Sequence, residues 1–146
     1  MLPDAEGDLA ATNFKTTLSR LRKLLGQHEF FLVRQGAVSL NREHCWTDVW
    51  RFTALAREIE AAGQPNGDAV PTARIETLAK QLALAYPRPL LCGGREEWIA
   101  PIRRRLHDRH QRCIEKLARL LERNGANEAA TDVRTSILSL EDAGCF

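Results

Sequence analysis

The chain has 146 residues, of which 44% are apolar and 27% are charged, and its formal net charge at pH 7 is +2. These values are typical of a soluble globular protein with one domain, or one domain and part of another, whose core needs no disulfides or metals. No apolar run approaches the roughly 18–20 residues that cross a bilayer, and the acidic start MLPDAEGDLAA differs from a signal peptide. The cysteines are widely spaced and form no CxxC pair, so we expect a reduced, cytoplasmic chain without membrane contact.

The first predicted element is a helix over residues 8–25, followed by a β-hairpin. Gly26 is a typical residue to end this helix, because glycine tolerates a positive φ. The apolar runs 30–33 and 37–40 predict two paired strands, with Gly36 in the three-residue loop between them. The helix places its apolar residues three or four positions apart, on one face: Phe14, Leu18, Leu21, Leu24 and Leu25.

Four more helices are predicted after the hairpin. The second begins at Thr47 or Asp48, either of which is a good N-cap, and ends at Gly63, where the linker-like segment 63–68 begins. The third runs from about Pro71 to just before Pro87, and an ordered loop follows it over residues 87–94. The fourth, about 96–124, and the fifth, 127 to about 140, form an antiparallel helical hairpin. We expect these residues to point inward: Val49, Phe52, Leu55, Ala56, Ile59, Ile75, Leu78, Leu82, Ala85, Ile102, Leu106, His110, Cys113, Leu117, Leu120, Leu121, Ala130, Val133, Ile137 and Leu140.

The sequence contains no GxSxG, HExxH or phosphate-binding glycine motif. His107, His110 and Cys113 lie on the fourth helix, but their spacing spreads them over about 120° of helix surface, so at most two could bind one metal well. We interpret them as a packing or interface histidine with a buried thiol. We therefore predict neither an enzyme nor a metal or cofactor site.

Three tryptophans, Trp46, Trp50 and Trp98, could stack on nucleic-acid bases. Tryptophans beside apolar helix positions are more typical of cores and interfaces, which is the interpretation we favour. Trp98 lies near the start of the fourth helix, and we expect it to hold the loop 87–94 against the helices.

Basic residues concentrate in two of the predicted helices. The first carries Lys15, Arg20, Arg22 and Lys23 against Asp8, a local charge of +3. The fourth carries eight basic and three acidic residues between positions 101 and 124, a local charge of +5. Each helix could bind a polyanion or present a solvated face, and composition does not decide between these alternatives.

The order of these elements resembles that of a known group of bacterial regulators. Residues 2–41 resemble the second half of a response-regulator-type winged helix, in which a recognition helix ending in LRKLLG precedes the wing hairpin. The remainder resembles the bacterial transcriptional activator domain, which is tetratricopeptide-like, although the family's usual glycine in the proline turn is Arg88 here. Three segments carry this second resemblance: WTDVWRF (46–52), ALAYPRPLLCGGREEWIAPIRRRL (83–106) and LARLLERNGANEAATDVRTSIL (117–138).

The resemblance implies a mainly α fold in two parts, a partial winged helix over residues 1–42 and the activator domain over residues 43–146. It implies a DNA-binding transcriptional regulator, with dimerisation, effector sensing or contact with RNA polymerase assigned to the helical domain. We expect protein contacts at Trp98, Arg104, Arg105 and His110. DNA contacts are expected from the outer face of the first helix and the hairpin tip, at Thr12, Asn13, Lys15, Thr16, Ser19, Arg20, Lys23, Arg34 and Gln35.

The first half of the winged helix is absent from this sequence, which we interpret as a fragment. We therefore expect weak, nonspecific DNA binding, and a homodimer formed through the uncovered apolar faces. The rival hypothesis is a stand-alone tetratricopeptide-like interaction module whose basic fourth helix binds an acidic protein without DNA binding.

Overall fold

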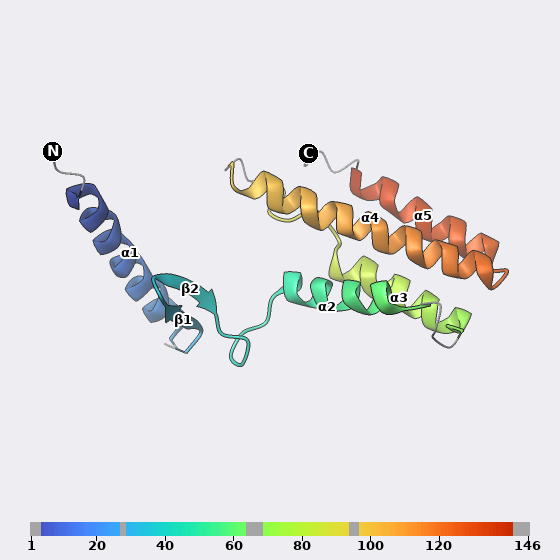
Figure 1. Cartoon of the computed structure of the whole chain (residues 1–146), viewed down its shortest axis with the longest axis horizontal. Helices are drawn as coiled ribbons and strands as arrows, with labels where there is room; N and C mark the ends of the chain where they lie inside the picture. Colours follow the sequence, from blue (N-terminus) through green and yellow to red (C-terminus); the bar gives the residue numbers. More distant parts are fainter. Residues whose placement is uncertain (1–3, 27–28, 64–68, 94–96, 142–146) are drawn as a thin grey trace. The chain divides into compact units, whose positions relative to one another are not determined.

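The computed structural model describes residues 4–26, 29–63, 69–93 and 97–141, with side chains between residues 7 and 135 of these ranges. This part of the chain is mainly helical, with five helices and one two-stranded antiparallel hairpin (Figure 1). The chain divides into two compact units, Met1–Trp46 and Thr47–Phe146. The predicted mainly α fold class is thus confirmed. No described helix has the length and apolar character that a membrane span requires.

The first unit contains α1 (Asp4–Leu25), β1 (Phe31–Arg34) and β2 (Ala37–Leu40). The helix begins four residues earlier than predicted and ends as predicted, with Gly26 at a φ of 70°. The hairpin loop has two residues instead of the expected three. Gln35 and Gly36 both have positive φ, 50° and 77°, which is the backbone geometry of a two-residue type I′ turn.

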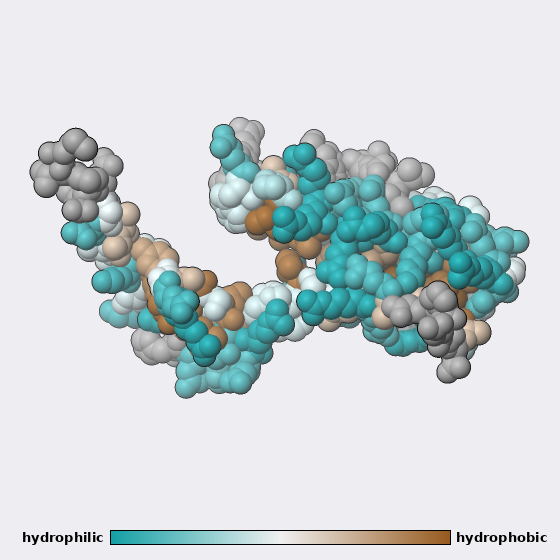
Figure 2. All heavy atoms as spheres, viewed as in Figure 1, coloured by the Kyte–Doolittle hydropathy of each residue, from teal (hydrophilic) through white to brown (hydrophobic). Residues whose placement is uncertain are grey.

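The first unit has no buried core among its described side chains. The strand register pairs Phe31 with Leu40 and Val33 with Val38, so these four apolar side chains share one face of the hairpin. Apolar residues also reach the surface along α1, where Leu24 is 83% exposed (Figure 2). Both elements of this unit are therefore amphipathic, and each keeps part of its apolar face exposed, while Leu18, Phe31 and Val38 are half-buried.

The second unit consists of α2 (Asp48–Ala61), α3 (Thr72–Ala85), α4 (Ile99–Arg123) and α5 (Asn127–Glu141). The hydroxyl of Thr47 accepts a hydrogen bond from the backbone N–H of Trp50 and caps α2 as predicted. The long helix α4 packs against the other three helices and runs antiparallel to α5 (Figure 1). The core is apolar and drawn from all four helices: Phe52, Leu55, Ala56, Ile59, Ile75, Leu78, Leu82, Ala85, Tyr86, Cys113, Ile114, Leu117, Ala118, Leu120, Leu121 and Ala130.

The inward positions predicted for α2 and α3 are confirmed, with Val49 partly exposed at the start of α2. On α4 the prediction fails at Ile102, which is 40% exposed, because Ile99 and Arg103 occupy the inward positions of its first turns. The side chains of Ile137 and Leu140 lie outside the described residues. The predicted linker does so too, from position 64 onward.

Arg103, and not Trp98, holds the loop that follows α3. Trp98 is 60% exposed, so the prediction that it pins this loop is wrong. The guanidinium of Arg103 is buried and donates hydrogen bonds to the carbonyl oxygens of Leu90 and Leu91, at 2.8 and 2.6 Å. A charged donor with two acceptors in one loop fixes that loop to α4 more firmly than an exposed indole could.

The described cysteines differ in oxidation state. Cys45 and Cys113 are free thiols, whereas Cys92 is disulfide-bonded. The expectation of a fully reduced chain is therefore wrong for Cys92.

Candidate functional surfaces

The polar face of α1 collects the residues that were expected to contact DNA. At 100° per residue, they span an arc of about 160°, opposite the arc of the apolar stripe. All seven are exposed, and Leu9 is the one large apolar residue within their arc. The face thus combines cationic, hydroxyl and amide side chains: Thr12, Asn13, Lys15, Thr16, Ser19, Arg20 and Lys23.

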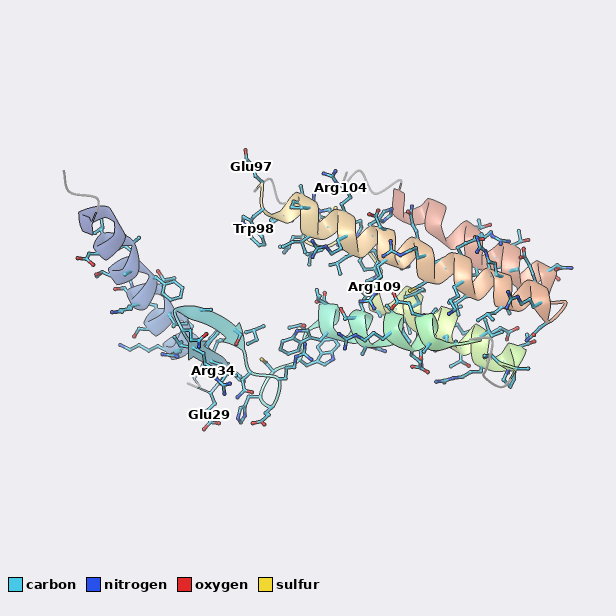
Figure 3. All side chains as sticks on the ribbon, in the orientation of Figure 1. Glu29, Arg34, Glu97, Trp98, Arg104 and Arg109 are labelled. Atoms are coloured by element: carbon cyan, nitrogen blue, oxygen red, sulfur yellow. The ribbon has the colours of Figure 1, made fainter. Side chains whose placement is uncertain are left out.

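Arg34 and Gln35 lie at the hairpin tip and are both exposed; Arg34 is labelled in Figure 3. Arg34 pairs with Ala37 at the last rung of the ladder, directly before the turn. Neither Arg34 nor the cations Lys15, Arg20 and Lys23 form an ion pair with another described residue. Their charges therefore stay available to an anionic partner.

A second basic surface runs along the outer side of α4. Arg104, Arg105, Arg112 and Arg123 are exposed and have no ion pair within the described part of the chain. Arg104 projects from the side of α4 that faces away from α2 (Figure 3). We call these four residues the arginine face.

The other charges of this region are largely paired. Arg109 binds the carboxylate of Glu60 on α2 with two hydrogen bonds of 2.8 Å, and this contact lowers the pKa of Glu60. Glu115 accepts from Arg119 on α4 and from Arg134 on α5, each at 3.0 Å. These pairs neutralise the flanks of α4 and leave a local excess of positive charge on the arginine face.

His110 is not a surface residue, which corrects its assignment to protein contacts. It is 2% exposed and its ring stacks on Tyr86 at 4.8 Å between centroids, while Phe52 lies 6.3 Å away. Burial, with a smaller contribution from the charge of His107, lowers the pKa of His110 to about 4. His110 is therefore a neutral member of an aromatic cluster in the core.

Trp98, Arg104 and Arg105 are exposed, so the remaining three predicted protein contacts are accessible. Cys113 is buried, and burial raises the pKa of its thiol to about 11. Among the described residues, no group of three His, Cys, Asp or Glu side chains could hold a metal ion.

Sequence reasoning missed the inward position of Arg103 and the burial of Tyr86. The available signal was positional, because Arg103 falls at an inward position of α4 between Ile99 and His107. A basic residue at such a position needs acceptors inside the protein.

Comparison of the chain with family models, with curated proteins and with solved structures finds no match.

Proposed function

We propose that this chain is the DNA-contacting and protein-contacting part of a transcriptional regulator. Its first unit would supply a recognition helix and a wing, and its second unit a tetratricopeptide-like helical domain. The observation that carries this proposal is the division of α1 into a polar, cationic face and an opposite apolar face, directly before a hairpin with Arg34 at its tip.

The dimensions of α1 suit this role. An α-helix with its side chains is about 10–12 Å across, and the major groove of B-DNA is about 12 Å wide. Lysine and arginine side chains at Lys15, Arg20 and Lys23 would bind phosphates and fix the register of the helix. The hydroxyl and amide side chains between them are of the types that bind base edges.

The exposed apolar face of α1 supports the same proposal. A recognition helix in a winged helix packs its apolar side on neighbouring helices, and the stripe that includes Leu21 and Leu24 would pack there. Leu21 and Leu24 of that stripe are exposed, so the described contacts fix the orientation of the helix only loosely. We therefore expect weak DNA binding with little sequence preference.

Fluorescence anisotropy with a labelled 20-base-pair duplex of arbitrary sequence tests this proposal. The double variant Lys15→Glu/Arg20→Glu should weaken binding about tenfold or more and reduce its salt dependence, because about two phosphate contacts are lost. The matched control is Arg51→Glu/Arg57→Glu, which reverses the charge of two exposed arginines on α2 and changes the net charge by the same amount as Lys15→Glu/Arg20→Glu. Equal effects of the two variants would refute a DNA-binding role for α1. Tight, sequence-selective binding by the unaltered chain would refute the expected weak binding mode.

The arginine face favours a second candidate, a protein-interaction module that binds an acidic partner. None of its four arginines forms an ion pair within the described residues, and they extend over about 19 residues, or about 28 Å, of α4. The variant Arg104→Glu/Arg105→Glu separates the candidates. Under the DNA proposal, Arg104→Glu/Arg105→Glu leaves the anisotropy titration with DNA largely unchanged. Under the rival proposal, the same variant abolishes binding of a polyglutamate peptide, and Lys15→Glu/Arg20→Glu has no effect on that binding.

A further inference from the structure

Helix α4 carries a charge pattern that repeats every seven residues. The segments 105–111, 112–118 and 119–125, the last of which runs just past the end of the helix, each begin with an arginine. Each segment also has an acidic residue at its fourth position and a basic residue at its fifth. Packing accounts for the largely buried residues at the second and third positions, but it does not determine which charges recur at exposed positions.

The arginines that begin the three repeats form a nearly straight row on the solvent side of α4. Arg105, Arg112 and Arg119 are all exposed, and we call them the arginine row. Seven residues of an α-helix rise about 10.5 Å and fall about 20° short of two full turns, so the row spans about 21 Å within an arc of about 40°. The row lies between Arg104 and Arg109, which project from opposite sides of α4 (Figure 3).

The charges of the arginine row are accessible to a partner. Arg105 and Arg112 form no ion pair with another described residue. Arg119 pairs with Glu115 of the same helix at 3.0 Å, and its side chain is 69% exposed. Exposed pairs of this kind are weak, so Arg119 can exchange Glu115 for a carboxylate of a partner. Glu115 would keep its ion pair with Arg134 on α5.

The surface along the arginine row is hollowed. Two open hollows, of about 340 and 420 Å³, both include Arg112 in their lining. The first also includes Arg105, and the second includes Arg119 and Gly63, so together they follow the whole row. A Cβ at Gly63 would lie 2.5 Å from Cδ2 of Leu120, so the glycine allows the end of α2 to approach α4 closely and to form one wall. This groove can accommodate a rod-shaped anionic partner.

The spacing of the arginine row favours an α-helical partner. A second α-helix has the same rise, so its residues i, i+7 and i+14 repeat at the same interval of about 10.5 Å. Three residues of a β-strand span about 10 Å, but residues three positions apart point to opposite faces of the strand. Each strand of duplex DNA winds through a full turn in about 34 Å, so its phosphates leave a straight row within 21 Å.

We propose that the arginine row docks an acidic α-helix of another protein, which carries Asp or Glu at seven-residue intervals and places one carboxylate on each arginine. Because the row drifts by about 20° in seven residues, the two helices cross at about 20° with a left-handed twist. A second copy of α4 is disfavoured, since the local charge of +5 would make two such helices repel each other. This inference rests on the second candidate function, an acidic protein partner, and adds the secondary structure and charge spacing of that partner.

Two designed peptides test the spacing. Each is a capped helix of about 22 residues, built from alanine and glutamine with three glutamates and an uncharged fluorophore. The glutamates are seven residues apart in the first peptide, and five residues apart in the second, where successive carboxylates are rotated by about 140°. Fluorescence anisotropy measures binding to the whole chain at about 10 mM salt, where screening is weak. We expect the first peptide to bind about fivefold more tightly than the second.

Removal of the arginine row should abolish this preference. The variant Arg105→Gln/Arg112→Gln/Arg119→Gln should weaken binding of the first peptide about fivefold or more, to the level of the second peptide. Circular dichroism verifies that the variant keeps its helical content, which we expect because all three side chains are exposed. An unchanged preference for the first peptide in this variant would overturn the inference.

The matched control removes three exposed positive charges away from the row, in the variant Arg51→Gln/Arg57→Gln/Arg88→Gln. It changes the net charge by the same amount and should keep the preference for the first peptide. Loss of the preference in both variants would overturn the inference, because it would show attraction by net charge alone.

Equal affinity of the unaltered chain for the two peptides would overturn the inference, as would the absence of binding by both. Polyglutamate separates this failure from failure of the second candidate function. If polyglutamate binds the unaltered chain, an acidic partner remains supported without the helical spacing, and if it does not bind, both fail. Binding of duplex DNA that is lost in the row variant but kept in the matched control would assign the row to nucleic acid and overturn the inference.

Discussion

Protonation of His110 should make the helical unit less stable in mild acid. The imidazole is buried against Tyr86, and its Nδ1 atom has no hydrogen-bond partner among the described residues. Because the pKa is about 4 in the folded chain and about 6.5 in the unfolded chain, the unfolded state takes up the proton first as the pH falls. Stability is therefore full above about pH 6.5 and is lost progressively down to about pH 4.

The size of the effect follows from the two pKa values. One pKa unit corresponds to about 1.4 kcal/mol, so the complete loss over 2.5 units is about 3.5 kcal/mol, and the part between pH 7 and pH 5 is about 2 kcal/mol. The carboxylates of Glu60 and Glu115 are ion-paired and have lowered pKa values, so their contribution is lost only below their unfolded pKa of about 4.5. The interval from pH 7 to pH 5 thus lies above the range in which these carboxylates contribute.

Urea unfolding followed by circular dichroism at pH 7, 6 and 5 measures this loss. His110→Phe keeps an aromatic ring in the cluster and removes the titrating group, so its free energy of unfolding should vary much less with pH. His44→Gln changes an exposed histidine and should retain the pH dependence of the unaltered chain. The reasoning fails if His110→Phe loses as much stability between pH 7 and pH 5 as the unaltered chain does.

Two further outcomes are expected. Arg103→Met removes the hydrogen bonds to the carbonyl oxygens of Leu90 and Leu91, so it should lower the free energy of unfolding by about 2–4 kcal/mol and speed proteolytic cleavage within this loop. An unchanged urea midpoint would contradict the role of Arg103. The exposed apolar residues of α1 should cause self-association, so sedimentation velocity should show a dimer at high protein concentration. The variant Leu21→Ser/Leu24→Ser should convert this dimer to monomer. A strictly monomeric profile of the unaltered chain would argue against dimerisation.

The helices of the second unit were predictable because their apolar residues repeat with helical period and their ends carry strong local signals. Thr47 caps α2, and Ile75, Leu78 and Leu82 lie on the buried face of α3, as the spacing alone predicts. Such signals depend on neighbouring residues, so they need no knowledge of tertiary contacts. The same periodicity predicted the two faces of α1.

The loop region was predicted poorly because its stabilising contacts join residues far apart in sequence. Trp98 is the more apolar neighbour of the loop, yet Arg103 binds the carbonyls of Leu90 and Leu91. The burial of His110 and the unpaired hydroxyl of Tyr86 are likewise set by the packing of α2 against α3 and α4. The two-residue turn at Gln35 was missed because glutamine is an uncommon residue at positive φ.

The coreless first unit has a consequence for the energetics of recognition. With only Leu18 and Arg22 half-buried among its described side chains, α1 depends largely on the helix–coil equilibrium of its own sequence, and a helix of 22 residues held in this way is only partly formed in water. Any partner that binds this face must also shift that equilibrium, so part of the contact free energy is used to order the backbone. Alanine substitutions at exposed positions such as Ser19 would consequently strengthen binding by raising helicity before the partner arrives, even where they remove a contact of little value.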